Sequence, residues 1–491
     1  MKKKLAYNTL TSLIYNLVTI ACGLILPRVV LGRFGSEVNG LVDSITQFLS
    51  AITFLELGIG AVVRSALYKP LAEKNDDEVS KVLVSANKFF RRIARVLFVY
   101  VIILAFVYPL ISNNNYGYGY VATMVVILSI GSFAQYYFGI VNSLLLAADQ
   151  RGYIQYSTQI IAVMLNAVAT ILLINYGCGI HVVKMTTAMI YLIQPLVMHL
   201  YVRTHYSINK RIEYSGEPIK QKWNGIAQHI ATIILTGTDN IVLTIFSTLS
   251  DVSIYSVYNK VVYGITQLMN ALTSGIQSIF GELWAKNEKE KLFQYYALIE
   301  WMLHTVVTFI FGVTAILIVP FINVYTDGII DANYNQPIFG VMLVMANAFS
   351  CYRIPYNLMI LAAGHYKQTQ NGFIISAGIN VIVSIVAVKL CGLIGVVFGT
   401  LIAVLYQTMY MANYTARNLV NWPMKKTIKQ FAIDMLTIIL MYGITWNIQL
   451  GQLSYISWIL LAIQCSLISI IIVALVNLLF YKDRVFNIFR K

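Results

Sequence analysis

The sequence is poor in charge. Only 11% of its 491 residues are Asp, Glu, Lys or Arg, whereas 58% are hydrophobic and the mean hydropathy is +0.71. A water-soluble domain carries about 25% charged residues, and a chain this apolar cannot hide its surface inside one globule. It needs a lipid bilayer as its solvent, so a soluble globular protein is excluded.

The motifs of nucleotide-driven and hydrolytic enzymes are also absent. No glycine is followed by lysine, which excludes a P-loop, and no Asp-x-Asp, Gly-x-Ser-x-Gly or His-Glu-x-x-His pattern occurs. The six histidines are scattered along the chain. We therefore expect no enzymatic activity, no cofactor and no metal centre. Any driving energy would come from an ion gradient or from the substrate's own gradient.

Cysteine is scarce as well. The five cysteines lie within or beside apolar runs, and no Cys-x-x-Cys pair exists. We interpret them as small apolar packing residues. At the N-terminus, three lysines followed by a long apolar run predict an uncleaved first membrane span that starts in the cytoplasm.

Long apolar runs fill most of the chain. A membrane-spanning helix needs about 20 mostly apolar residues, and this rule gives about fourteen spans. We place them at residues 9–30, 41–64, 93–112, 120–147, 154–175, 182–203, 225–247, 253–281, 295–322, 337–362, 369–390, 393–415, 430–450 and 455–480. Because each segment must satisfy its own backbone groups, the predicted fold class is an all-α polytopic membrane protein.

Basic residues occupy alternate gaps between these spans. The gaps after even-numbered spans hold most of the Lys and Arg, as in the stretch from Lys69 to Arg92, whereas residues 113–118 and 327–336 contain none. This is the positive-inside pattern, so we predict that both termini lie in the cytoplasm. The net charge of +15 is thereby explained without a nucleic-acid partner.

One stretch occurs twice. Residues 142–149 read NSLLLAAD and residues 357–364 read NLMILAAG, and each copy is followed at a matching distance by an asparagine, Asn166 or Asn380, and then by a Cys-Gly pair. The alternative is chance similarity between aliphatic segments. We favour a duplication with six spans in each copy. Because six is even, both copies enter the membrane in the same direction and form a parallel repeat.

The duplication predicts two six-helix lobes around a central cavity, with two further helices at the C-terminus. The expected domains are an N-lobe at 1–203, a cytoplasmic linker at 204–224, a C-lobe at 225–416, and the two extra helices with a cytoplasmic tail at 417–491. The lobes would be related by an axis along the membrane normal.

Polar residues inside the spans recur at helical spacing. One such stripe contains Lys260, Gln267 and Asn270, and a second lies in residues 41–64 at matching places of the repeat. Intramembrane polar residues usually face the bundle interior or water, so the stripes predict the cavity lining. The alternative is that they only form hydrogen bonds to neighbouring helices. Three tyrosines near the first stripe would offer aromatic faces to sugars: Tyr255, Tyr258 and Tyr263.

Several basic residues lie near membrane depth. At a helix centre each costs about 2.5 to 3.5 kcal/mol unless a partner or ligand compensates it. Cations in a low-dielectric cavity suit an anionic ligand. We assign the following residues to substrate binding: Arg28, Arg64, Lys260 and Arg353, with Gln267 and Asn270. For Arg28, an outward extension of its side chain toward the headgroups is the alternative.

Four acidic residues lie at similar depth. Glu56 and Asp239 are nearest to polar stretches, so we expect one of them to bind H⁺ or Na⁺ during transport. A salt bridge to a neighbouring Arg or Lys is the structural alternative. Glu300 and Asp434 receive no role. Residues 73–92 mix acids, bases and apolar side chains, which predicts a separate amphipathic helix at the lipid headgroups.

Several stretches resemble one superfamily of membrane proteins. They are LPRVVLGRFG at 26–35, LELGIG at 55–60, Thr238-Asp239-Asn240 and the LAAG turn that ends at Gly364. The pattern resembles the Wzx-type polysaccharide-biosynthesis flippases of the multidrug/oligosaccharidyl-lipid/polysaccharide (MOP) exporter superfamily. The resemblance covers nearly the whole chain.

This resemblance implies two six-helix lobes around a cavity lined mainly by spans 1, 2, 7 and 8. It implies a flippase that moves undecaprenyl-diphosphate-linked oligosaccharide units to the outer leaflet for surface polysaccharide assembly. The implied partners are that lipid-linked oligosaccharide, the membrane lipid and polysaccharide assembly proteins. The related peptidoglycan-precursor flippases use arginines in their first two spans, and Arg28 matches one of these approximately.

Three other functions stay open. A cation-coupled multidrug antiporter of the same superfamily would favour an acidic cavity and about twelve spans. A membrane-embedded polysaccharide polymerase or lipid-linked glycosyltransferase would need a catalytic loop on the outer face, where the gaps here are short. A non-transporting scaffold of a glycan assembly complex is the third.

Overall fold

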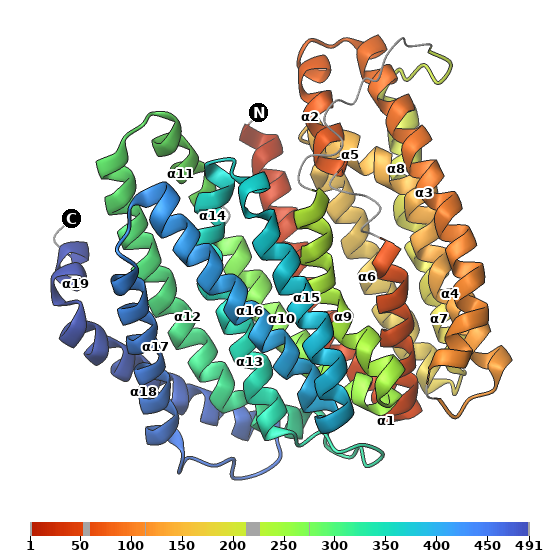
Figure 1. Cartoon of the computed structure of the whole chain (residues 1–491). Helices are drawn as coiled ribbons and strands as arrows, with labels where there is room; N and C mark the ends of the chain where they lie inside the picture. Colours follow the sequence, from red (N-terminus) through yellow and green to blue (C-terminus); the bar gives the residue numbers. More distant parts are fainter. Residues whose placement is uncertain (1, 53–58, 113, 213–225, 274, 490–491) are drawn as a thin grey trace. The chain divides into compact units, whose positions relative to one another are not determined.

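The computed structural model describes residues 2–52, 59–112, 114–212, 226–273 and 275–489 (Figure 1). Within these ranges every regular element is a helix. The first half contains α1 (Lys2–Ser50), α2 (Ile59–Ala72), α3 (Asp76–Ile111), α4 (Tyr118–Ala134), the π-helix η2 (Gln135–Gly139), α5 (Ile140–Ala148), α6 (Gly152–Asn175), α7 (Ile180–Tyr191) and α8 (Ile193–His205). The second half contains α9 (Ile226–Phe246), α10 (Leu249–Thr273), α11 (Ile276–Ala285), α12 (Lys289–Tyr325), α13 (Pro337–Tyr352), α14 (Ile354–Ala362), α15 (Tyr366–Cys391), α16 (Leu393–Thr415), the π-helix η3 (Ala416–Val420), α17 (Met424–Thr445), α18 (Tyr455–Phe480) and α19 (Lys482–Phe489).

These helices have the lengths that a membrane requires. Among the described residues, eleven continuous helical stretches are long and apolar enough to cross a bilayer. α1 covers two expected spans, because Gly35 (φ 82°, ψ 176°) interrupts its helical geometry. α9 and α10 correspond to two further expected spans. The predicted all-α polytopic membrane fold with about fourteen spans is confirmed.

The two most polar predicted spans are not single helices. In the range 253–281, α10 ends at Thr273 and α11 begins after Gly275, which is its N-cap. In the range 41–64, α1 ends at Ser50 and α2 begins at Ile59. Hydropathy alone predicts one span in each range, because apolar residues lie on both sides of the point where the first helix ends.

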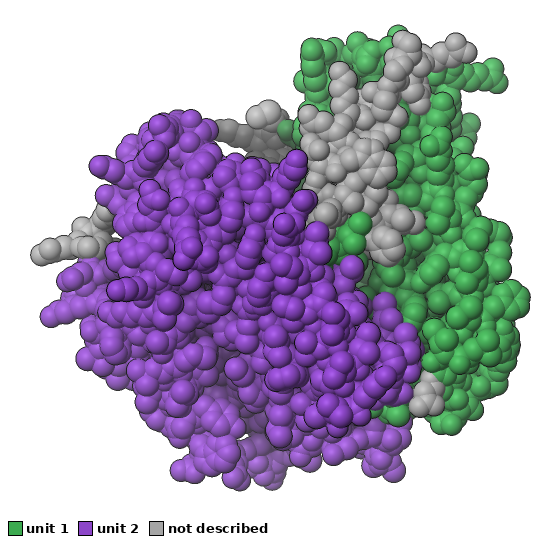
Figure 2. Space-filling view, viewed as in Figure 1, with its two compact units in different colours: residues 1–233, 248–253 green, residues 234–247, 254–491 purple. Residues whose placement is uncertain are grey.

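The chain divides into two compact units (Figure 2). Unit 1 comprises Met1–Ile233 and Thr248–Ser253, and unit 2 comprises Ile234–Ser247 and Ile254–Lys491. The domain boundaries expected from the repeat, at 203, 224 and 416, remain predictions.

The short segment Thr248–Ser253 is held in unit 1 by close contacts with α1. The side-chain amide of Asn39 donates to Ser253 Oγ at 2.9 Å, and Leu249 is buried in the same core as Leu41. A Cβ placed on Gly40 would lie 1.8 Å from the carbonyl oxygen of Leu249. Only glycine permits this approach of two backbones.

The duplication is visible in the helix bounds. α5 (Ile140–Ala148) and α14 (Ile354–Ala362) are both nine residues long, and each follows an interruption of a longer span. The interruption is η2 before α5 and the single residue Arg353 before α14. α6 and α15 then begin at matching distances, at Gly152 and Tyr366. Element bounds that repeat in this way support a duplication rather than chance similarity.

α3 is longer than the sequence predicts. Residues 73–92 do not form a separate surface helix, because α3 runs without a break over Asp76–Ile111. Asn75 caps its start by accepting the backbone N–H of Glu78 at 3.0 Å, and three carboxylates occupy the first turn. Phe90 and other apolar residues of this part lie in the core of unit 1. The amphipathic face therefore packs against protein.

In unit 2, α15 and α16 pack with their backbones in close contact. A Cβ on Gly395 would lie 2.1 Å from the carbonyl oxygen of Ala387, and one on Gly399 would lie 2.2 Å from Ser384 Oγ. Small residues four apart allow this approach inside a membrane. α12, α17 and α18 pack together in the same unit.

Candidate substrate and ion sites

Arg353 occupies the break between α13 and α14. Pro355 follows it closely and cannot donate a backbone hydrogen bond, which favours an interrupted helix at this point. The Arg353 side chain is half-buried, and it forms no ion pair or hydrogen bond with any residue that the structure describes. A cation in such a place is available to an anionic ligand.

The other basic residues predicted for substrate binding come from three further helices. Arg28 on α1 is half-buried and lies near Gly32, one turn further along. Arg64 on α2 is exposed and forms no ion pair within the described ranges. Lys260 on α10 is half-buried. Arg28 and Arg64 belong to unit 1, whereas Lys260 and Arg353 belong to unit 2.

The polar stripe on α10 exists as a chain of exposed side chains. Gln267 donates from Nε2 to the Tyr263 hydroxyl at 2.6 Å, and Asn270 donates to Gln267 Oε1 at 3.4 Å. Tyr255 and Tyr258, expected beside this stripe, are buried instead. Only Tyr263 therefore offers an accessible aromatic ring next to Gln267 and Asn270.

Asp239 on α9 is the centre of a buried oxygen cluster in unit 2. It is only 3% exposed, the Tyr255 hydroxyl donates to its Oδ2 at 2.8 Å, and the Thr400 hydroxyl lies 2.9 Å from both carboxylate oxygens. Asn380 donates from Nδ2 to Thr400 Oγ1 at 2.9 Å and accepts from the Thr238 hydroxyl at 2.6 Å. Residues of α9, α10, α15 and α16 therefore converge on one carboxylate.

This carboxylate has no cationic partner. No Lys, Arg or His in the described ranges forms a salt bridge with Asp239. An ionised carboxyl that is buried without a counter-charge is costly, and a bound proton or cation relieves that cost. The oxygens around Asp239 are hard ligands of the kind that alkali and alkaline-earth cations prefer. No group of three or more His, Cys, Asp or Glu side chains that could hold a metal occurs among the described residues. Glu56, the second predicted ion-binding residue, lies outside them.

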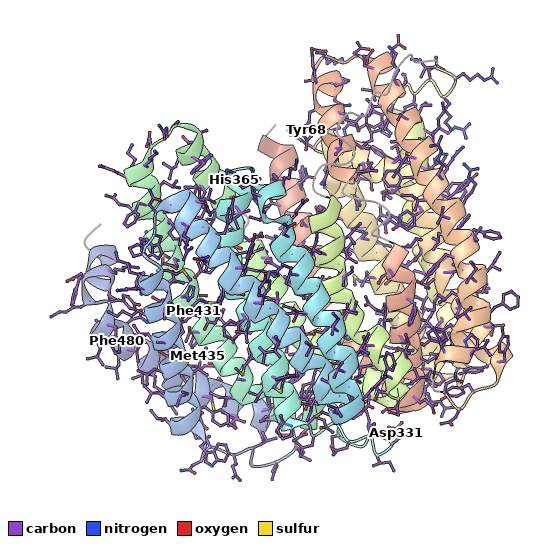
Figure 3. All side chains as sticks on the ribbon, in the orientation of Figure 1. Tyr68, Asp331, His365, Phe431, Met435 and Phe480 are labelled. Atoms are coloured by element: carbon purple, nitrogen blue, oxygen red, sulfur yellow. The ribbon has the colours of Figure 1, made fainter. Side chains whose placement is uncertain are left out.

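Unit 2 contains a second buried polar network, which the sequence indicated only in part. His304 on α12 lies 2.6 Å from Asp434 Oδ2 through Nδ1 and 2.9 Å from the Tyr356 hydroxyl through Nε2. Tyr356 in turn donates to Glu300 Oε1 at 3.2 Å. Phe431, labelled in Figure 3, packs edge-on against the His304 ring, and the two ring centres are 4.8 Å apart. The network joins α17 to α12 and α14.

A weak signal for part of this network was present in the sequence. Glu300 and His304 are four residues apart and so share one face of α12. Nothing in the sequence connects them with Asp434, which is 130 positions from His304. Only the packing of α17 on α12 brings these side chains together.

The arrangement of these helices is similar to that of solved membrane transporters and flippases. A solved structure described as lipid II flippase MurJ in an inward closed conformation matches with a TM-score of 0.73 and 15% identity, covering 97% of this chain and 99% of that chain.

Two solved structures described as a multidrug resistance MATE family transporter of the MOP superfamily have a similar fold. The inward-facing one matches with a TM-score of 0.58 and 14% identity over 81% of this chain and 96% of its own. The outward-facing one matches with a TM-score of 0.52 and 16% identity over 84% of this chain and 94% of its own. No protein-family model matches the sequence, and no curated protein matches it in sequence. The structure thus shows a multi-pass membrane fold similar to those of these solved structures.

Proposed function

We propose that this protein is a flippase that moves undecaprenyl-diphosphate-linked oligosaccharide units from the cytoplasmic to the outer leaflet by alternating access. It would act in the cytoplasmic membrane of a bacterium, with both termini in the cytoplasm, and would supply the assembly of surface polysaccharide. The chemistry is transport, so no covalent bond is made or broken.

The observation that carries this proposal is Arg353, a half-buried cation without a partner among the described residues. A guanidinium can grip a diphosphate through two parallel hydrogen bonds, which a lysine cannot. Arg64 is likewise without an ion pair in the described ranges. Arg28, Lys260, Gln267 and Asn270 would supply further contacts to phosphate and sugar.

The extent of the structural match supports a lipid-linked substrate. The MurJ structure, named for the flipping of lipid II, covers 97% of this chain, whereas the two MATE structures cover 81% and 84%. α17 and α18 lie beyond the twelve duplicated spans and complete a chain of MurJ length.

For coupling, we assign the binding of H⁺ or Na⁺ to Asp239. Its carboxylate is buried, forms no salt bridge with the described residues, and receives hydrogen bonds from the Tyr255 and Thr400 hydroxyls. Occupation by a proton or by Na⁺ would neutralise the cluster, and release on the other face would link the ion gradient to the transport cycle. Glu56 remains a second candidate from the sequence.

The test is complementation of a strain that lacks its own repeat-unit flippase. Arg353→Ala and Arg64→Ala should abolish surface polysaccharide and cause lipid-linked repeat units to accumulate inside. Loss of one charge-assisted phosphate contact should weaken substrate binding by on the order of 10- to 100-fold. Arg353→Lys should rescue only in part, and Lys425→Ala, at an exposed position on α17, should behave as wild type. Normal surface polysaccharide in both Ala variants would reject these residues as the phosphate site.

The second candidate is a cation-coupled multidrug antiporter. The fold shared with MATE transporters and the Asp239 cluster favour it. Expression in a drug-sensitive strain separates the two functions. A flippase leaves drug tolerance unchanged and restores surface polysaccharide, whereas an antiporter does the opposite.

A further inference from the structure

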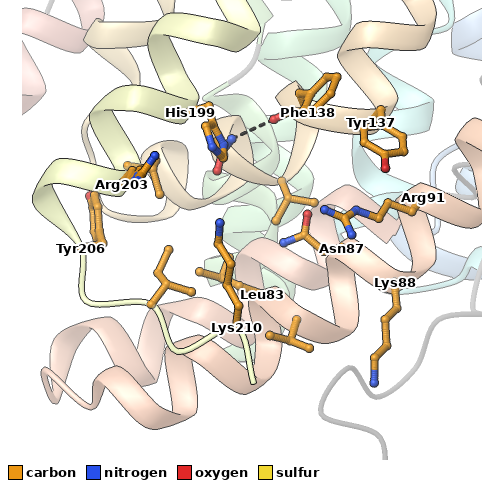
Figure 4. Close-up of a pocket in the computed structure, with 15 residues that line it drawn as sticks. Leu83, Asn87, Lys88, Arg91, Tyr137, Phe138, His199, Arg203, Tyr206 and Lys210 are labelled. Atoms are coloured by element: carbon orange, nitrogen blue, oxygen red, sulfur yellow. Dashed lines mark hydrogen bonds between the residues drawn. The ribbon is translucent and has the colours of Figure 1, made fainter. Parts of the chain in front are cut away.

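Unit 1 contains a cationic pocket of about 300 Å³ (Figure 4). Its walls come from α3, η2, α5, α8 and the segment that follows α8. Four basic residues line it: Lys88, Arg91, Arg203 and Lys210. None of the described residues that line it is acidic. Figure 4 shows Arg91, Lys210 and the neutral amide of Asn87 directed into one common space.

The pocket is held together by hydrogen bonds of its walls. The backbone N–H of Asn209 donates to Ser80 Oγ at 3.0 Å, which fixes the segment after α8 on α3 and places Lys210 at the pocket. The guanidinium of Arg91 lies 5.2 Å from the centre of the Tyr137 ring. The side-chain amide of Asn142 donates to the carbonyl oxygen of Phe138 at 2.8 Å, shown as a dashed line in Figure 4.

The pocket keeps its positive charge because the neighbouring carboxylate is already paired. Asp149 forms a salt bridge with Arg151 Nε at 2.7 Å and accepts from the Tyr206 hydroxyl at 2.7 Å. Burial, together with Asp149, raises the pKa of Tyr206, so this phenol stays protonated. Arg91, Arg203 and Lys210 form no ion pair with any residue in the described ranges.

An apolar groove lies next to the cationic pocket. It has a volume of about 650 Å³, and Phe138 lines both cavities. The groove lies between α3, α4 and the start of α8, and Ser129 is the only hydroxyl-bearing residue in its lining. Phe98 and Phe106 are more than half exposed there. An aromatic groove on the outside of a membrane protein is a surface for hydrocarbon chains.

We propose that the cationic pocket and the apolar groove together bind one anionic phospholipid of the membrane. Its phosphate lies between Arg91, Arg203 and Lys210, and an acyl chain lies along the groove past Phe138. The ligand carries an anion and a hydrocarbon chain at once, because Phe138 lines both cavities. A pocket near 300 Å³ is at the small end of ligand sites and suits a phosphate with glycerol rather than an oligosaccharide.

The location agrees with the distribution of anionic lipids. The side chain of Asn8 near the start of α1 bonds to the carbonyl oxygen of Gln150 and to the backbone N–H of Tyr153, beside the Asp149–Arg151 pair. The pocket is therefore at the end of unit 1 where the chain begins, which the charge pattern predicts to be cytoplasmic. That leaflet carries anionic lipids that basic residues attract. The site is separate from Arg353 and Asp239, which belong to unit 2.

Native mass spectrometry of the full-length protein in detergent tests this inference. Phosphatidylglycerol and phosphatidylcholine with identical acyl chains are titrated separately. We expect phosphatidylglycerol to bind at least about tenfold more tightly, since each cation contributes roughly fivefold. Arg203→Gln with Lys210→Gln should remove this preference. The matched control is Arg92→Gln with Arg95→Gln, two exposed arginines of α3 that do not line the pocket, and it should retain the preference.

Further arms of the experiment test the groove and the identity of the ligand. Ala105→Phe, which fills the groove, should weaken phosphatidylglycerol binding while all cations remain. If Ala105→Phe folds poorly, Ile102→Gln tests the groove instead. It places a polar side chain in the lining without filling the groove, and it should weaken phosphatidylglycerol binding in the same way. Three results would overturn the proposal. Phosphatidylcholine could bind as tightly as phosphatidylglycerol, or the control variant could lose the lipid preference as fully as the pocket variant. Inorganic phosphate could also bind as tightly as the lipid. Displacement of phosphatidylglycerol by equimolar undecaprenyl phosphate would assign the site to the prenyl lipid instead. None of these measurements depends on transport.

Discussion

The two copies of the repeat share a buried asparagine and a threonine, but only the second copy has an aspartate at the position of Asp239. Asn166 on α6 corresponds to Asn380 on α15, and both are buried. Thr187 corresponds to Thr400, and each donates to a valine carbonyl four residues earlier, at 3.0 and 3.3 Å. The position of Asp239 in unit 2 corresponds in the repeat to Pro27 of α1.

This difference shows how a duplicated fold can specialise. In unit 1 the corresponding side chains are uncharged: Asn166 accepts from the Thr170 hydroxyl at 3.5 Å, and Thr187 donates within its own helix. Addition of one carboxylate creates a site that needs a proton or cation for neutrality. Proline at the corresponding place can neither bind an ion nor donate a backbone hydrogen bond. We therefore expect ion coupling to depend on unit 2 alone.

The largest effect is expected from Asp239→Asn. This change keeps the shape and removes the charge, so transport should lose its dependence on the Na⁺ or H⁺ gradient entirely. Flux of lipid-linked substrate in proteoliposomes, measured with each gradient imposed in turn, checks it and identifies the ion. Asn166→Ala in the other repeat is the matched control and should keep gradient dependence. If transport by Asp239→Asn still depends on the ion gradient, another residue couples transport to that gradient.

A second effect concerns the His304 network of unit 2. Asp434→Asn removes the carboxylate that lies 2.6 Å from His304 Nδ1, and loss of a buried hydrogen bond of this kind costs about 1–3 kcal/mol. The Tm of the purified protein should fall by roughly 2 °C or more. Glu290→Gln, at an exposed position near the start of the same helix α12, should leave the Tm unchanged. An unchanged Tm in Asp434→Asn would mean that the network contributes nothing to the docking of α17.

The sequence predicted the fold more fully than the sites, for a physical reason. Hydropathy acts along the chain, so the span expected at 455–480 is α18 (Tyr455–Phe480) and the span at 393–415 is α16 (Leu393–Thr415). Where a helix is amphipathic because protein covers it, as in the first half of α3, hydropathy places its start too late.

The sites depend on contacts between distant parts of the chain. Asp239 was identified from its charge at membrane depth, but its partners Asn380 and Thr400 lie more than 140 positions away. The sequence singles out Asn380 only as a residue that recurs in both copies of the repeat. The link between His304 and Asp434 gave no local signal at all, because neither periodicity nor spacing connects α12 with α17.

A smaller effect should come from the close packing of α15 on α16. Gly399→Leu would force a side chain against Ser384, and overpacking of this kind costs about 1–3 kcal/mol. Thr186 occupies the corresponding place in the first repeat and already carries a side chain, so Thr186→Leu should be tolerated better. Thermal unfolding of both variants measures the difference. Equal losses would show that the two repeats pack these helices alike.

The last prediction changes no activity and tests whether the two repeats are parallel. Glu73 and Lys286 lie in exposed turns before α3 and α12, and Asn115 and Asn335 lie in exposed loops after those helices. In a variant whose native cysteines are replaced by alanine, single cysteines at these four positions are treated with a membrane-impermeant thiol reagent on intact cells. Cysteines at 115 and 335 should react, and those at 73 and 286 should react only after the membrane is opened. Corresponding positions must behave alike, because six spans per copy return the chain to the same side. If 73 and 286 were labelled from opposite sides, the repeat would be inverted, and the assignment of the cationic pocket to the cytoplasmic leaflet would have to be tested separately.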